Sequence, residues 1–159
     1  MIIVSMDPGL DGHITCMDSF HPLLSSFYKM PTIQPSKGRK KRVVDGHAIR
    51  DILIETDPSI VIIEKVGASP RMGSASAWSF ATSYTMLIGI CIGMDLDYAL
   101  ITPQKWKSFH GLLKKDKDDS RLKIISLFPK LKPEFTLKKD VDKAESFLIG
   151  LAWWGINCK

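Results

Sequence analysis

Short runs rich in apolar residues predict five β-strands along the chain. Continuous runs of this kind, bounded by turn residues, are typical of strands that are buried on both faces. The Asp11-Gly12 pair between the first two runs favours a tight hairpin turn. The expected strands span residues 2–6, 13–17, 23–30, 59–64 and 98–101.

Apolar residues at helical spacing predict helices between and after the later strands. In the last helix, Ala144, Phe147 and Leu148 begin an apolar stripe that continues through Leu151 and Ala152. A proline at the first helical position favours another helix that begins at Pro103. The remaining expected helices span residues 43–55, 74–93, 120–127 and 142–155, with loops or connectors over residues 31–42, 114–119 and 129–139.

The order of these elements predicts an α/β fold with a mixed sheet. Strands joined by short turns pair antiparallel, whereas strands separated by helices run parallel. The first three strands therefore form the antiparallel part of one five-stranded sheet, the last two extend it in parallel, and helices cover both faces. A chain of 159 residues suits one domain, residues 1–159, with its own core.

Composition narrows the class of protein. Hydrophobic residues make up 45% of the chain and charged residues 25%, which excludes a disordered or collagen-like chain. The net charge of +5 is a mild basic bias that is compatible with a nucleic-acid partner. Three distant cysteines indicate neither a disulfide framework nor a zinc site. The first residues lack a basic signal region, and residues 75–94 contain polar side chains, so we expect a cytoplasmic protein in which that segment is a buried helix and does not span a membrane.

Two of the expected strands end in a carboxylate. Asp7 follows residues 2–6, and Glu64 closes the apolar run 60–63. If these strands are parallel neighbours, both acids emerge at the same edge of the sheet, where adjacent strands lie about 4.8 Å apart. Two carboxylates at that spacing suit a divalent cation with oxygen ligands. The alternative is that each acid only marks the end of a strand.

The final helix adds a second acidic pair, Asp142 and Glu145, which lie at i and i+3 on neighbouring helix surface. The alternative is that they are first-turn acids that complement the helix dipole. The offset of Asp140 points it away from that surface. The histidines are scattered without zinc spacing. Two hard cations held close together are the recurring device for phosphodiester hydrolysis, so these acids indicate a nuclease.

Four short motifs follow one another across nearly the whole chain: Met6-Asp7-Pro8-Gly9, Ile63-Glu64-Lys65-Val66, Thr102-Pro103-Gln104-Lys105-Trp106-Lys107 and Asp142-Lys143-Ala144-Glu145-Ser146-Phe147-Leu148. This ordered set resembles the RuvC-type Holliday junction resolvases of the RNase H-like superfamily, and most of all their compact phage forms. The resemblance implies a homodimeric endonuclease that makes paired nicks in four-way DNA junctions. It also implies two Mg²⁺ ions per active site, for which Mn²⁺ substitutes.

The resemblance places Asp7, Glu64, Asp142 and Glu145 on the family's four acidic positions. Bacterial members usually have Asp at the position of Glu145, and the Glu form is associated with phage relatives. Bacterial members also commonly have Gln at the position of Lys65. Lys107 and Lys117 match, by position, lysines that resolvases hold near the scissile phosphate. The basic residues that we expect to face DNA are Arg39, Lys40, Lys41, Arg71, Lys105, Lys107, Lys114, Lys117 and Arg121.

The long helix over residues 74–93 corresponds to the dimer interface of the family. Small residues at Ser76, Ser79 and Ser83 permit close approach of a second copy, and Trp78, Tyr84 and Met86 supply apolar contact. For Trp78 and Phe80 we favour packing in the core or the dimer over stacking on bases.

Other functions fit the sequence less well. An RNase H-like enzyme acting on RNA–DNA hybrids or other branched DNA would share the metal site but act as a monomer. Sugar kinases and actin-like ATPases need two such domains with a nucleotide between them, and 159 residues are too few, so no nucleotide cofactor is expected. A non-catalytic junction-binding protein would have no need of four intact acids.

Overall fold

The computed structural model of the chain describes residues 1–34, 42–65, 67 and 73–158. Its strands are β1 (Ile2–Met6), β2 (His13–Asp18), β3 (Ser26–Lys29), β4 (Thr32–Ile33), β5 (Val43–Val44), β6 (Ile60–Glu64) and β7 (Tyr98–Ile101). Its α-helices are α1 (Gly46–Thr56), α2 (Ser74–Gly93), α3 (Pro103–His110), α4 (Asp118–Leu127) and α5 (Val141–Asn157). Three short 3₁₀-helices are η1 (Pro22–Leu24), η2 (Pro129–Phe135) and η3 (Lys138–Asp140).

The main sheet has five strands in the order β3-β2-β1-β6-β7. β1 pairs antiparallel with β2, and β2 pairs antiparallel with β3, whereas β6 lies parallel to both β1 and β7. The predicted mixed sheet is therefore confirmed. Met6 is level with Ile63 in the β1–β6 pair, so the residues that follow, Asp7 and Glu64, leave neighbouring strands at the same edge.

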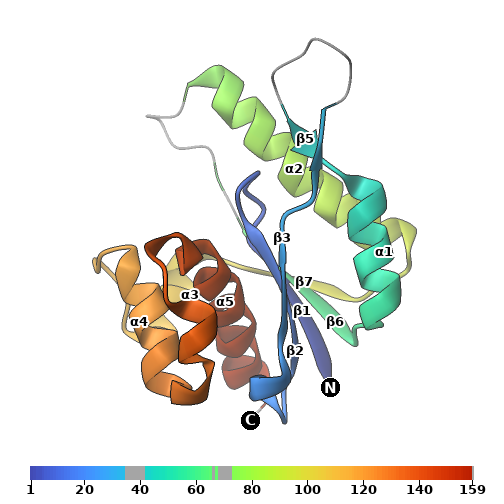
Figure 1. The fold of residues 1–159 in the computed structure, drawn as a ribbon. Helices are drawn as coiled ribbons and strands as arrows, with labels where there is room; N and C mark the ends of the chain where they lie inside the picture. The colour runs from blue at the N-terminus through green and yellow to red at the C-terminus, as the bar shows by residue number, and fades with distance from the viewer. Residues whose placement is uncertain (35–41, 66, 68–72, 159) are drawn as a thin grey trace.

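Helices cover both faces of this sheet: α1 and α2 lie on one side, and α3, α4 and α5 lie on the other (Figure 1). Alternation along β1 explains this arrangement, because successive side chains of a strand point to opposite faces. Ile3 belongs to the core cluster that contains Phe147 of α5, whereas Val4 and Met6 belong to the second core cluster, which contains Leu53 of α1. The predicted apolar stripe of α5 is buried as expected.

Several predicted boundaries shift for local reasons. The helix expected from residue 43 begins at Gly46, because Asp45 caps it by accepting hydrogen bonds from the backbone N–H groups of His47 and Ala48. Val43 and Val44, expected to begin the helix, instead form β5. β5 pairs with β4, which lies within residues 31–42, the segment expected to be a loop. The region 129–139, also expected to be a loop, contains η2 and η3.

α2 has the predicted bounds, but the expectation that it is a buried helix is wrong. Its buried residues are Ser83, Leu87 and Cys91, one per turn, and Trp78 is 77% exposed. Core packing of Trp78 is therefore excluded within this chain. By length and composition alone, α2 is long and apolar enough to cross a membrane, with 17% of its most apolar window buried.

Candidate metal centre

Three carboxylates from distant parts of the chain meet at one edge of the sheet. Asp7, Asp142 and Glu145 each offer an oxygen atom, and these atoms lie within 4.8 Å of one another. Asp7 follows β1, and the other two lie in the first turns of α5, which packs across β1 and β2. Carboxylate oxygens at this spacing suit a hard divalent cation, because such cations take several oxygen ligands.

A tight hairpin fixes Asp7. Its backbone N–H donates to the carbonyl of His13 at 3.0 Å, and the N–H of Gly9 donates to Asp7 Oδ1 at 3.2 Å. Gly12 is required for this turn, because a Cβ atom there would lie 2.2 Å from the carbonyl oxygen of Asp7. Burial raises the pKa of Asp7 to about 6, and the charges of Asp142 and Glu145 act in the same direction.

Glu64, at the end of β6, lies beside this cluster and outside the group of three. Burial raises its pKa to about 7, and the charges of Asp7 and Glu145 add to that rise. The indole Nε1 of Trp106 donates a 2.7 Å hydrogen bond to Glu64 Oε1, which holds the carboxylate in one orientation. Trp106 is 1% exposed in α3, so the bond comes from a rigid part of the core.

Two lysines face the acids of α5. Lys117 Nζ lies 2.5 Å from Asp142 Oδ1, and Lys107 Nζ lies 3.6 Å from Glu145 Oε1. Ser120 donates to the same oxygen of Glu145 at 3.3 Å. Lys107 comes from α3, and Lys117 immediately precedes α4. These ammonium groups partly offset the acidic charge and give a phosphate a favourable approach.

The other basic residues divide into three groups. Lys105 and Lys114 are exposed and available to a ligand. The guanidinium of Arg121 donates to both oxygens of Asp118 and to the carbonyl of Phe135, which favours a structural role over phosphate contact. Four predicted DNA contacts, Arg39, Lys40, Lys41 and Arg71, lie outside the described residues.

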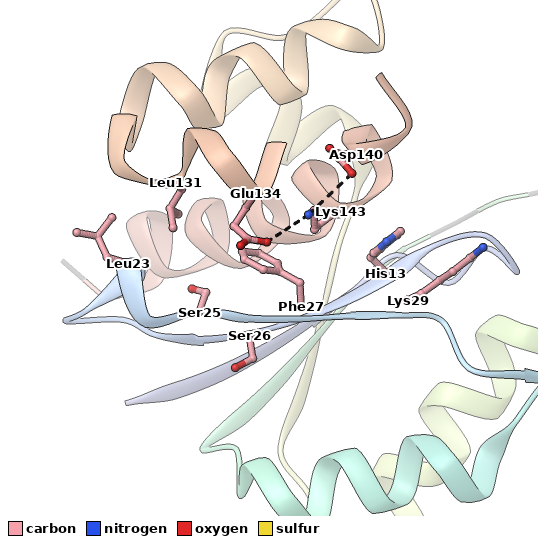
Figure 2. Close-up of a pocket in the computed structure, with 10 residues that line it drawn as sticks. All are labelled: His13, Leu23, Ser25, Ser26, Phe27, Lys29, Leu131, Glu134, Asp140 and Lys143. Carbon is pink, nitrogen blue, oxygen red and sulfur yellow. Dashed lines mark ion pairs between the residues drawn. The ribbon is translucent and has the colours of Figure 1, made fainter. Parts of the chain in front are cut away.

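Asp140 lies away from the acidic cluster, in agreement with its offset in the sequence. Its side chain accepts a 2.8 Å hydrogen bond from the N–H of Leu137 and lies 3.9 Å from Lys143 Nζ. Figure 2 shows Asp140 and Glu134 both directed at Lys143, in a separate pocket of about 580 Å³. Lys143 also lies over the ring of Phe27, so it joins η2, η3 and α5 to the sheet.

Sequence reasoning missed the partners that orient the acids. Trp106 and Ser120 carry no charge, and their contacts cross 42 and 25 residues of sequence, so the helical pattern alone shows them only as core positions.

The raised pKa values predict how the metal-free protein responds to pH. A carboxyl group with a raised folded-state pKa binds its proton more tightly in the folded protein, so stability falls as pH rises through that interval. For Asp7 and Glu64 the interval runs from 3.8 and 4.5 to about 6 and about 7. In EDTA at pH 8, Asp7→Asn should therefore unfold at a higher denaturant concentration than wild type, with a free energy of unfolding larger by about 3 kcal/mol. The difference should shrink as the pH falls and vanish only below the unfolded-state pKa of 3.8. A destabilised Asp7→Asn at pH 8 would contradict this account of the site.

The fold has clear counterparts among solved structures. RuvC of T. thermophilus in complex with a Holliday junction substrate is 15% identical, with a TM-score of 0.62 over 98% of this chain and 96% of that one. Fowlpox virus resolvase, in complex with Holliday junction DNA, is 18% identical, with a TM-score of 0.55 over 100% of both chains. The yeast mitochondrial Holliday junction resolvase is 10% identical, with a TM-score of 0.54 over 97% of this chain and 80% of its own.

No protein-family model and no curated protein sequence matches the chain. At these identities the structural likeness establishes the fold. The predicted RNase H-like architecture, with its mixed five-stranded sheet, is therefore confirmed.

Proposed function

We propose that this chain is a RuvC-type Holliday junction resolvase of the phage-like kind, with residues 1–159 forming one nuclease domain. It cuts four-way DNA junctions by paired, symmetric nicks through divalent-metal-dependent phosphodiester hydrolysis. The observation that carries the proposal is the cluster of Asp7, Asp142 and Glu145, with Glu64 beside it. This cluster lies on a fold whose solved counterparts include resolvases bound to junction DNA. We further propose a cytoplasmic protein that needs neither a membrane nor a nucleotide cofactor.

The donor set fits two Mg²⁺ ions, with Mn²⁺ as a substitute. Asp7, Glu64, Asp142 and Glu145 would hold them, since all offer carboxylate oxygens and hard cations prefer oxygen ligands. When bound, such a pair of cations supplies an activated water and stabilises the leaving oxygen. Because burial raises the pKa of Glu64 to about 7, this acid is partly protonated near neutral pH and would lose that proton as the cations bind. Asp7, with a pKa raised to about 6, would release a proton on binding mainly at pH 6 and below.

Lys107 and Lys117 should act on the reaction as well as on binding. Phosphate contacts release counterions, so affinity should fall steeply as salt rises, and Lys107→Ala or Lys117→Ala should lower that slope by about one. Each variant should also lose catalytic rate, about 10-fold or more, because an ammonium group near the scissile phosphate stabilises developing charge. Single-turnover cleavage and junction titrations at several salt concentrations measure the two effects.

Lys105→Ala is the matched control for this pair. Lys105 lies on the same helix as Lys107, is exposed, and contacts none of the four acids among the described residues. Its replacement should weaken binding with an unchanged rate at saturation. A salt-independent affinity of the wild type would count against any surface that reads the DNA backbone.

A homodimer supplies the two active sites that paired nicks need, and a C₂ pair matches the near two-fold symmetry of a junction. The exposed face of α2 supports it: Trp78, Thr85, Gly89 and Ile92 are all exposed and follow one another at helical spacing. This stripe revises the surface expected from the sequence, because Ser83 is 3% exposed and its hydroxyl donates to the carbonyl of Ser79.

Gly89→Arg should break this dimer and preserve the fold. No atom lies within 4 Å of a Cβ added at Gly89, so the arginine fits the isolated chain but brings a charge into the interface. Sedimentation at ~50 µM should show a dimer for the wild type, since a Kd of ~1 µM favours it, and a monomer for the variant. Glu55→Arg, on the exposed surface of α1, should remain dimeric. A wild type that is monomeric at this concentration and also on junction DNA would exclude the dimer.

The proposed function is tested with a synthetic four-way junction, a linear duplex and an RNA–DNA hybrid, each incubated with and without Mg²⁺. We expect cleavage of the junction alone, and only with the cation. Preferential cleavage of the hybrid would favour the RNase H-like alternative, and junction binding without cleavage would indicate a non-catalytic binder.

A further inference from the structure

A buried network of hydroxyl groups lies beneath the acidic cluster. Ser5 of β1, Thr15 of β2 and Ser146 of α5 are all 0% exposed. Ser5 donates to the carbonyl of Ser146 at 2.7 Å, and the hydroxyls of Thr15 and Ser146 lie 2.6 Å apart. Ser146 donates to the carbonyl of Lys143 at 2.9 Å, so Thr15 is the donor to Ser146. Every hydroxyl proton of the network therefore has an acceptor.

The network occupies the layer directly below the carboxylates. Ser5 and Asp7 are two residues apart at the end of β1, on the same face of the sheet. Ser146 follows Asp142 by four residues, so both lie on the same face of α5. Gly150 continues this face by one more turn, and a Cβ added there would lie 2.7 Å from Ser5 Oγ. The face of α5 that carries Asp142 thus sits against β1 without intervening side chains.

Hydrogen bonds constrain the position of a helix more tightly than apolar contact does. Apolar packing is non-directional, so a helix can shift along a sheet with little change in buried area. A buried hydroxyl loses its partner after a small displacement, and an unpaired buried polar group is costly. α5 carries Asp142 and Glu145, whose negative charges repel that of Asp7. Without a cation, this repulsion favours a wider separation between α5 and β1. The network opposes that shift.

We propose that Ser5, Thr15 and Ser146 are positioning residues, which set the separation between the acids of α5 and Asp7 and so the affinity of the centre for a divalent cation. This inference rests on the proposed function, because it assumes that these acids bind the cation. The three hydroxyls do not touch the cation or the DNA; they act through the placement of α5.

Thr15→Val tests this role, because valine keeps nearly the same shape and removes the donor. We expect calorimetric titration with Mn²⁺ to show a Kd raised about 10-fold or more, the range typical of residues that orient metal ligands. The Mg²⁺ concentration for half-maximal cleavage should rise in parallel, and the rate at saturating Mg²⁺ should fall less. Thr15→Ser restores the hydroxyl and should return the Mn²⁺ affinity to within about 2-fold of wild type.

Ser83→Ala is the matched control. Ser83 is also a buried helical serine that donates to a backbone carbonyl, but it lies in α2 on the other side of the sheet. Its replacement should leave the Mn²⁺ affinity unchanged, whatever its effect on melting temperature. If Thr15→Val does not fold, Ser146→Ala provides the same measurement, since it removes the acceptor of the Thr15 hydroxyl.

The outcomes separate this inference from the proposed function. A wild type that binds no Mn²⁺ would reject the metal centre and the inference with it. A wild type that binds Mn²⁺, with Thr15→Val binding equally well, would reject the positioning role alone. Equal weakening in Thr15→Val and Ser83→Ala would also reject it, because the effect would then follow general stability.

Discussion

Asp7→Asn and Glu64→Gln should each abolish junction cleavage, with a loss of more than about 100-fold in single-turnover rate, while junction binding stays intact or becomes stronger. Each substitution removes one ligand charge and nearly preserves the shape of the side chain. It also lessens the repulsion between the acidic centre and the phosphates, which in the wild type opposes binding without a cation. Cleavage in Mg²⁺ and gel-shift titration in EDTA measure the two effects separately.

Asp97→Asn is the control for these variants. Asp97 is exposed next to β7, away from the carboxylate cluster, so its replacement changes the net charge by the same amount without touching the centre. It should cleave at the wild-type rate. Wild-type rates in Asp7→Asn or Glu64→Gln would remove the basis for the metal centre.

Asp142→Asn and Glu145→Gln should likewise lose cleavage, whereas Asp140→Asn should keep most of it. Asp142 and Glu145 lie within the carboxylate group, but the side chain of Asp140 is engaged with the N–H of Leu137 and with Lys143. Asparagine retains an acceptor for that N–H, so stability should change little. Single-turnover rates of the three variants decide the matter. If Asp140→Asn were inactive and Asp142→Asn active, the cation ligand at the start of α5 would be Asp140, and the assignment to Asp142 would be wrong.

The sequence predicts the parts of this site that follow from the periodic pattern of apolar residues in strands and helices. Asp7 and Glu64 each close an apolar run, and the order of strands and helices makes those runs parallel neighbours, as the Met6–Ile63 register confirms. Asp142 and Glu145 follow from the helical period, because the apolar stripe fixes which face of α5 turns inward. Once the topology of the sheet and its covering helices is correctly predicted, the proximity of Asp142 and Glu145 to Asp7 follows.

The features that the sequence does not predict depend on which elements cover one another. α2 contains no charged residue, and its small polar side chains mark no single solvent face, so only the fold reveals that Trp78 and Ile92 are exposed while Leu87 is buried. The Trp106–Glu64 hydrogen bond and the Ser5–Ser146 hydrogen bond span 42 and 141 residues, and neither partner type signals the other. Strands of two residues, such as β4 and β5, are too short to leave a periodic pattern.

The central claim is that two copies of this centre cut one junction at symmetric positions, and a supercoiled plasmid that extrudes a cruciform tests it most directly. Paired nicks within one complex convert the plasmid to linear DNA, whereas a single nick gives the open circle. We predict linear product in Mg²⁺, with the two cuts mapping to symmetric positions across the junction, and none with Glu64→Gln. Open circles alone, random cuts in a plasmid without the cruciform, or linear product from Glu64→Gln would contradict the claim.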